Sequence, residues 1–227
     1  MALWLVGCEV IDMNERLVPV EMPSSGARTH VLVEFTGFRC VNCPKAAETA
    51  QALQASYGEQ LILVAMHPAS NPFTQGKYDY TCPAADSIYQ WMGGTASTPF
   101  PTGNIDMAQH ENAYFSDPTE WASILHQAMT DTVVPDLSGA QKWYWLVEDS
   151  VQGVQAMPDG SVNKNYYHRH VLRGAWTDEA QVIVPAGCNR EQLYLLTLYT
   201  DTNDKHILQA YEKKLDSGSA QSPFRSY

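Results

Sequence analysis

The fold can be read first from residues 31–44, Val-Leu-Val-Glu-Phe-Thr-Gly-Phe-Arg-Cys-Val-Asn-Cys-Pro. An apolar run rich in β-branched residues over 29–35 predicts a buried strand. After a Cys-x-x-Cys pair, a proline opens an Ala- and Gln-rich segment that predicts a helix over 44–57. A second apolar run at 61–66 completes a strand–helix–strand unit, so we expect its two strands to pair in parallel.

Cys40 and Cys43 lie between the predicted strand and the predicted helix. A helix N-terminus carries unpaired N–H groups and partial positive charge, and both stabilise a thiolate. Cys40 is therefore the predicted nucleophile of thiol–disulfide exchange, exposed to its substrate, and Cys43 is the residue that closes the disulfide. A structural disulfide without chemistry is an alternative. A zinc site is a third interpretation, although no second cysteine pair supplies the further ligands.

Two further segments sharpen the redox hypothesis. Glu34 lies on the predicted strand, where a buried acid could take the proton of Cys43; a buried acid satisfied by hydrogen bonds is the alternative. Phe100, Pro101 and Thr102 precede a short predicted strand. A cis proline there would pack against the dithiol and hold a substrate backbone, with Phe100 and Thr102 beside it, whereas a trans turn proline is the alternative.

The remaining chain divides into an insertion and a β-rich region. Residues 68–98 read as an insertion with one helix, and a capped helix follows over 117–130. These complete a predicted α/β domain at 27–131. A small β-rich, sandwich-like domain is predicted at 132–214. Its apolar runs are 143–147, 165–172, 181–185, 192–200 and 205–211, with turn signals at 159–160 and 201–204.

The N-terminus suggests export. Leu-Val-Gly-Cys at 5–8 has the form of a lipobox, which makes Cys8 the predicted lipidation site; a short buried strand with a free cysteine is the alternative. The polar stretch at 9–26 reads as a linker, and 215–227 as a disordered tail.

Composition limits the classes of partner. The chain has 227 residues and a formal net charge of -11, so nucleic acid is an unfavourable partner. It has no apolar run long enough to span a bilayer. We expect no metal and no cofactor. Beyond Cys8 the cysteines are even in number, and Cys82 and Cys188 are interpreted either as a pair or as separate thiols.

Three histidines are weaker candidates. His67 follows the second predicted strand and borders the expected site of the cysteine pair, so a helper role is one interpretation. His168 and His170 alternate along a predicted strand and should face the same side. A packing or hydrogen-bonding role explains them better than a metal site does.

The run at 31–35, followed by four residues and Cys-x-x-Cys, resembles the thioredoxin signature, with Glu34 in place of the usual Asp. Pro-Thr at 101–102 resembles the cis-Pro-Thr of that family, so the resemblance favours a cis peptide bond there. Arg39 stands where a Trp normally precedes the first cysteine, and Val-Asn at 41–42 replaces Gly-Pro. The intervening pair tunes the redox potential.

A second resemblance covers roughly residues 8–212. It is to the thioredoxin-like outer-membrane lipoproteins of Bacteroidetes, the Omp family named for a size of twenty-eight kilodaltons. The motifs that carry it are Glu-Phe-Thr-Gly-Phe-Arg-Cys-Val-Asn-Cys-Pro at 34–44, Tyr-Gly at 57–58, Ala-Met-His at 65–67, Leu-Val-Glu-Asp at 146–149 and Tyr-His-Arg-His-Val-Leu-Arg at 167–173.

This resemblance implies a thioredoxin-like domain joined to a β domain, and a lipid-anchored outer-membrane location on the periplasmic or cell-surface face. Two functions are compatible with it. The first is thiol–disulfide exchange with the thiols or disulfides of exported proteins. The second is a non-enzymatic surface protein, an adhesin or assembly component, with a buried structural disulfide.

Overall fold

The computed structural model describes residues 27–78, 80–130 and 135–215. The predicted lipobox at 1–8 and linker at 9–26 lie outside these residues, as does all but the first residue of the predicted tail. The predicted domain boundary between residues 131 and 132 also falls outside them.

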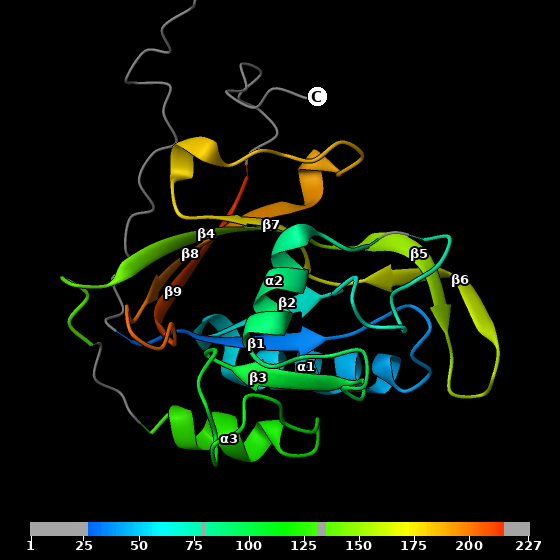
Figure 1. Ribbon diagram of the computed structural model, residues 1–227, viewed down its shortest axis with the longest axis horizontal. Helices are drawn as coiled ribbons and strands as arrows, with labels where there is room; N and C mark the ends of the chain where they lie inside the picture. The colour runs from blue at the N-terminus through cyan, green and yellow to red at the C-terminus, as the bar shows by residue number, and fades with distance from the viewer. Residues whose placement is uncertain (1–26, 79, 131–134, 216–227) are drawn as a thin grey trace, which may run out of the picture.

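The strand–helix–strand unit around the cysteine pair is present. Strands β1 (His30–Phe35) and β2 (Leu61–Met66) pair in parallel, and helix α1 (Cys43–Tyr57) connects them. Pro44 lies in the first turn of α1, where its missing N–H costs no hydrogen bond. Gly58 ends the helix with a φ of 58°, a conformation that glycine adopts without strain. The unit brings the carboxyl ends of β1 and β2 beside the start of α1 (Figure 1).

Seven strands form one mixed sheet in the order β3-β1-β2-β7-β4-β8-β9. The strands outside the first unit are β3 (Thr102–Ile105), β4 (Gln141–Glu148), β7 (Val171–Trp176), β8 (Leu193–Thr200) and β9 (Ile207–Lys214). Strand β7 runs parallel to β2, and the other added pairs are antiparallel.

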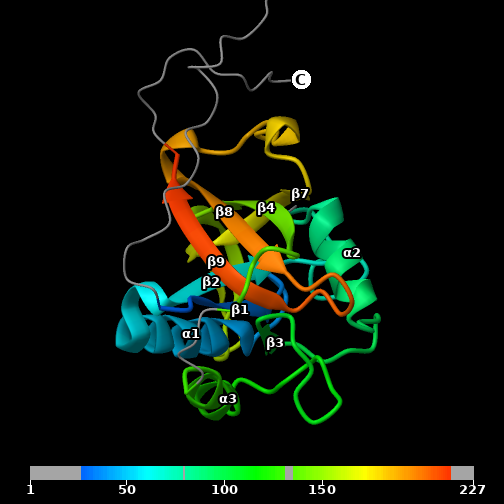
Figure 2. The ribbon, with the colours of Figure 1, turned by 90° about the vertical axis from the view of Figure 1, so that its left-hand side faces the viewer.

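Helices cover both faces of the first strands. Helices α1 and α3 (Trp121–Ala128) lie on one face of these strands. Helix α2 (Pro83–Trp91) lies on the other face, and the strands β4, β8 and β9 curl over that same face (Figure 2). The period of two in β1 separates the two cores: Leu32 packs with Ala46 and Trp121, while Val33 packs with Leu196 and Ile207 of the added strands.

The predicted second, sandwich-like domain is wrong in its architecture. Strands β4, β7, β8 and β9 extend the first sheet and share its core. The reason is the open edge of β2: its Ala65 N–H donates to the His170 carbonyl at 2.8 Å, so β7 pairs backbone groups that would otherwise be exposed. At the far end, the Ile207 N–H donates to the Asp106 carbonyl at 2.6 Å, and this bond returns β9 to the chain that follows β3.

A separate hairpin stands at one end of the sheet. Strands β5 (Val151–Ala156) and β6 (Val162–His168) pair only with each other (Figure 1). The single strand predicted over 165–172 is therefore wrong: the chain leaves the hairpin at His168 and enters β7 at Val171. Between them His170 adopts a left-handed φ of 51°.

The segment at 181–185, predicted as a strand, is not one: residue 181 ends a short 3-10 helix (Glu179–Gln181), and 182–185 form a loop. Its Val182 and Val184 are nevertheless buried, which explains the apolar pattern without a strand. Across the described ranges, none of the helices has the length and apolarity needed to cross a membrane.

Candidate functional site

Cys40 and Cys43 form a disulfide, with their Cα atoms 5.4 Å apart. Cys43 is the first residue of α1, and the Cys43 N–H donates to the Cys40 carbonyl at 3.3 Å. The loop that carries Cys40 begins at Thr36, directly after the end of β1. The pair therefore lies where the sheet meets the start of the helix, as the sequence predicts.

Cys40 is buried, not exposed as the redox hypothesis predicts. Each of the two cysteines is only 2% exposed. The cause is the β5–β6 hairpin, whose Gln155 side chain donates from Nε2 to the Cys40 carbonyl at 2.8 Å and to the Ala156 carbonyl at 3.0 Å. The Ala156 N–H also donates to the Phe38 carbonyl at 2.8 Å. The hairpin thus acts as a cap that is hydrogen-bonded to the cysteine loop.

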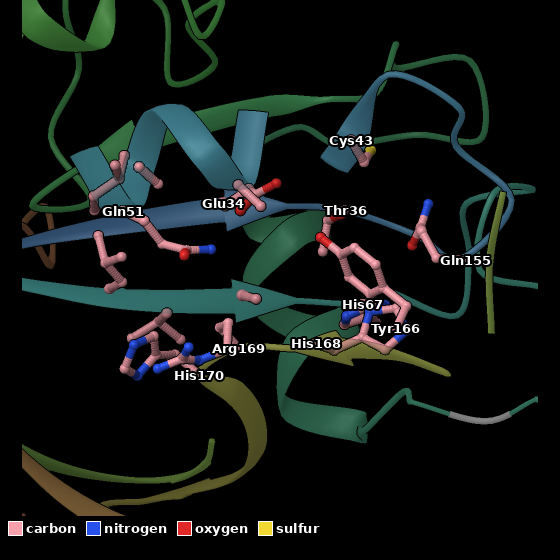
Figure 3. A pocket seen from close by; sticks show the side chains of 16 residues that line it. Glu34, Thr36, Cys43, Gln51, His67, Gln155, Tyr166, His168, Arg169 and His170 are labelled. Atoms are coloured by element: carbon pink, nitrogen blue, oxygen red, sulfur yellow. The ribbon is translucent and has the colours of Figure 1, made fainter. Parts of the chain in front are cut away.

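Glu34 shares a cavity of about 30 Å³ with Cys43 (Figure 3). This space is enough for a water molecule. Glu34 belongs to β1 and is 7% exposed; its side chain faces α1, as does that of Leu32 two residues earlier. Burial raises the pKa of the Glu34 carboxyl from 4.5 to about 8, and hydrogen bonding with the Thr36 side chain opposes this only in part. Its Oε1 has no hydrogen-bond partner within the described ranges.

Three other titratable groups that line the cavity, His67, His168 and Tyr166, have pKa values shifted toward their neutral forms. Burial, followed by the charges of His168 and Arg173, lowers the pKa of His67 well below its usual value. Burial lowers the pKa of His168 to about 4, although the Val154 carbonyl 3.2 Å from its Nε2 opposes the shift. Burial and the nearby Glu34 raise the pKa of Tyr166 to about 12. Glu34 is therefore the group of these four whose pKa is brought close to neutral pH.

His67 and His168 belong to an aromatic cluster between strand β6 of the hairpin and the chain that follows β2. The ring of His67 lies 5.5 Å from the rings of both Tyr80 and His168, and Tyr166 contacts His168 at 4.9 Å. Neither ring nitrogen of His67 is hydrogen-bonded among the residues that the structure describes. His168 and His170 both line the cavity, but they do so from a chain corner and not from one continuous strand.

Two ion pairs anchor the root of the hairpin. Arg169 Nε lies 2.6 Å from Asp149 Oδ1, and these two residues flank the hairpin where it leaves and rejoins the sheet. Arg173 Nε lies 2.7 Å from Glu148 Oε2, and Glu148 Oε1 accepts the Asn189 N–H at 2.7 Å. The charged motifs at 146–149 and 167–173 thus fix the geometry of the cap.

The segment at 100–102 lies mainly inside the protein. The Phe100–Pro101 peptide bond is cis. Phe100 is buried and stacks on Phe73 with ring centroids 6.0 Å apart. Thr102 is buried as well, and its hydroxyl donates to the Ser116 carbonyl at 3.0 Å. Both side chains are engaged internally, whereas Pro101 between them is half-buried.

Cys82 and Cys188 lie in different parts of the described structure: Cys82 belongs to the same buried core cluster as the cysteine pair, whereas Cys188 packs in a separate cluster. Cys82 is the N-cap residue of α2, and its sulfur accepts the Ala85 N–H at 3.4 Å. Cys188 is half-buried beside Leu146, and burial raises the pKa of its thiol to about 11. Cys82 and Cys188 are not bonded to each other.

No cluster of three metal-ligating groups gathers at the cysteine pair within the described ranges. The cluster that those ranges do contain lies in the β8–β9 turn and consists of Asp201, Asp204 and His206.

Gln155 and Tyr166 are the site residues that sequence reasoning missed. The Asp-Gly turn signal at 159–160 predicts a turn between two strands, but it does not show where those strands pack. The bond from Gln155 to Cys40 joins residues 115 positions apart, and nothing in the local pattern reports such a contact.

Comparisons with known proteins show a shared fold. No family model matches the chain, and no curated protein matches it. Among solved structures, HBP35 of Porphyromonas gingivalis aligns over 87% of this chain and 79% of its own, with 14% identity and a TM-score of 0.59. Protein AGR_C_4864 from Agrobacterium tumefaciens aligns over 86% of this chain and 98% of its own, with 10% identity and a TM-score of 0.44. The mixed α/β fold of this chain is thus similar to that of HBP35.

Proposed function

We propose that the chain exchanges disulfides with the thiols of exported proteins through Cys40 and Cys43. One observation carries the proposal: the Glu34 carboxyl, with its pKa raised to about 8, lines the same small cavity as Cys43. A group with a pKa near the working pH can both deliver and accept a proton. The chemistry needs no cofactor, because the disulfide itself carries the two electrons.

A purely structural role explains this arrangement poorly. The disulfide joins residues only three positions apart, and so short a loop gives little stabilisation through the unfolded state. Glu34 in turn lowers stability, because burying a polar group without full hydrogen bonding costs free energy. A protein that uses the cysteines only as a brace has no need of a buried acid beside them.

The reaction balances as follows. A substrate thiolate attacks the Cys40 sulfur, a substrate–Cys40 disulfide forms, and the Cys40–Cys43 bond breaks. Cys43 leaves as a thiolate, and Glu34 protonates it. A second substrate thiolate then attacks the substrate sulfur, releases Cys40 as a thiolate and closes the substrate disulfide. Cys40 and the Glu34 carboxylate then each take up one proton from water, which replaces the two protons that the substrate thiols lost when they became thiolates. The substrate loses two electrons and two protons, and the cysteine pair gains them. The reverse sequence reduces a substrate disulfide.

Access to Cys40 requires the hairpin cap to move. The hydrogen bonds that hold it to the cysteine loop include one from the Gln155 side chain to the Cys40 carbonyl and one from the Ala156 N–H to the Phe38 carbonyl, each of modest net strength. Beside the pair, Val41 and Phe73 are 43% and 37% exposed. We assign these apolar side chains and Pro101 to contact with an unfolded or extended substrate chain.

The proposal includes the location of the protein. A disulfide persists in an oxidising compartment, which agrees with export. We place the chain in the cell envelope, anchored to the outer membrane by lipid on Cys8, on its periplasmic or cell-surface face.

The burial of Cys40 favours a second candidate. A disulfide that is 2% exposed at each cysteine is also what a non-enzymatic envelope protein, an adhesin or assembly component, would contain. The two candidates differ in whether reductants and substrates reach the pair in the folded state.

Catalysed reduction of insulin by dithiothreitol separates them. We expect the wild type to accelerate the reaction, Cys40→Ser to abolish the acceleration, and Glu34→Gln to slow it by about tenfold or more at pH 7. Cys188→Ser serves as the matched control and should retain the wild-type rate. A wild type no faster than dithiothreitol alone, with its Cys40–Cys43 bond still intact by mass spectrometry, would establish the structural alternative.

A further inference from the structure

A second and larger cavity lies between α2 and the sheet, with a volume of about 370 Å³. Its walls are mainly apolar and include Ile88 and Trp91 of α2, Met107, and Trp143 and Trp145 of β4. It shares no lining residue with the cavity at Cys43. Its size falls within the range of sites that hold small molecules.

One buried donor behind the wall of this cavity lacks a partner. Trp145 is 1% exposed, and its indole Nε1–H meets no acceptor among the residues that the structure describes. A buried tryptophan usually finds an acceptor for this group, because leaving the donor unsatisfied costs free energy. The nitrogen itself has almost no accessible surface, so a ligand in the cavity does not reach it, and polar recognition must come from another lining residue.

The same cavity carries a positive charge. Lys205 lines it from the β8–β9 turn, and its Nζ lies 5.1 Å from the centre of the Trp91 ring. No carboxylate of the described ranges forms an ion pair with this lysine. Its backbone is fixed by a left-handed φ of 61° and by an N–H bond to the Asp201 carbonyl at 3.1 Å. Among the described residues that line the cavity, Lys205 is the one with a charged side chain, so the lining favours an anion.

We propose that this cavity binds a small monocarboxylate with an apolar body, of the medium-chain fatty-acid type. The carboxylate supplies the negative charge that pairs with the Lys205 ammonium group. The aliphatic chain packs against Ile88, Met107 and Trp143, where it leaves water. This site is independent of the disulfide chemistry.

Calorimetric titration of the full chain with decanoate tests the site. We expect saturable one-to-one binding, with affinity falling about fourfold for each methylene removed in the series down to octanoate. Decanol, which has the same chain without the charge, should bind at least about tenfold more weakly. Absence of decanoate binding, or equal affinity for decanol, would overturn the proposal.

Matched lysine variants place the site on the structure. Lys205→Met should weaken decanoate binding by about tenfold or more and leave decanol binding unchanged. Lys214→Met is the control, because Lys214 also lies over an aromatic ring, that of Tyr194, but lines no part of this cavity. Equal losses in Lys205→Met and Lys214→Met would show non-specific attraction and would refute the assignment.

Discussion

Replacing Glu34 with glutamine should stabilise the protein at neutral and alkaline pH and flatten the pH dependence of its stability. Glutamine keeps the shape of the side chain and removes its titration. In the wild type, the folded state holds the Glu34 proton up to a pKa of about 8, whereas the unfolded state releases it near 4.5. Stability is therefore highest below the lower value and is lost as the pH rises through the higher one.

The magnitude follows from the distance between these two pKa values. Each unit corresponds to about 1.4 kcal/mol, so ionisation in the unfolded state alone costs the wild type about 3 kcal/mol at pH 7. The full cost is about 5 kcal/mol above pH 8. Glu34→Gln should escape this loss. Its advantage over the wild type should grow with pH between about 4.5 and 8 and then level off.

Urea unfolding of the disulfide-bonded proteins from pH 5 to pH 9 measures the difference. The comparison between variants isolates Glu34, because His67 and His168 titrate in both proteins. Glu48→Gln on the exposed face of α1 is the matched control and should follow the wild-type curve. If the stabilities of the wild type and Glu34→Gln changed in parallel with pH, the inference that burial raises the pKa of Glu34 would be refuted.

Three other perturbations have defined outcomes. Gln155→Ala removes the hydrogen bond to the Cys40 carbonyl and should speed reduction of the disulfide by dithiothreitol by about threefold to tenfold. The rate is measured by acid quenching and mass spectrometry, and an unchanged rate would show that the hairpin does not limit access to the disulfide. Asp106 has a left-handed backbone, which asparagine also tolerates, and its carboxylate forms an ion pair with Arg28 at 3.0 Å. Asp106→Asn removes this carboxylate, so the free energy of unfolding in urea titrations should fall by about 2 kcal/mol; a fall of less than about 0.5 kcal/mol would contradict the reasoning. Cys188, with its pKa raised to about 11, should react with iodoacetamide at pH 7.5 about a hundredfold more slowly than glutathione does and should lose this protection in urea; equal rates in the folded chain would contradict its burial.

The local half of the fold could be predicted from sequence. The apolar run at 61–66 coincides with β2, and the helix predicted at 44–57 differs from α1 by one residue. These elements follow from short-range patterns: β-branched apolar runs, a proline in the first helical turn and a glycine after the last. The position of the cysteine pair between strand and helix follows from the same patterns.

The non-local half could not be predicted in this way. An apolar strand looks the same whether it packs in a second sheet or extends the first, so the runs after residue 140 did not show that β7 pairs with β2. The cap over Cys40 depends on where the β5–β6 hairpin packs, and its key residue, Gln155, has the composition of an ordinary polar strand position. Exposure of Cys40 was wrongly predicted for that reason.

Trapping on the Cys43→Ser variant is the most direct test of disulfide exchange at this site. Without its resolving partner, Cys40 should attack an insulin disulfide in the folded state and remain linked to one insulin chain, as intact mass and peptide mapping would show. Cys40→Ser should trap nothing. If folded Cys43→Ser failed to form the adduct while the same variant formed it readily in urea, the account would be contradicted, and the cysteine pair would be a buried structural disulfide.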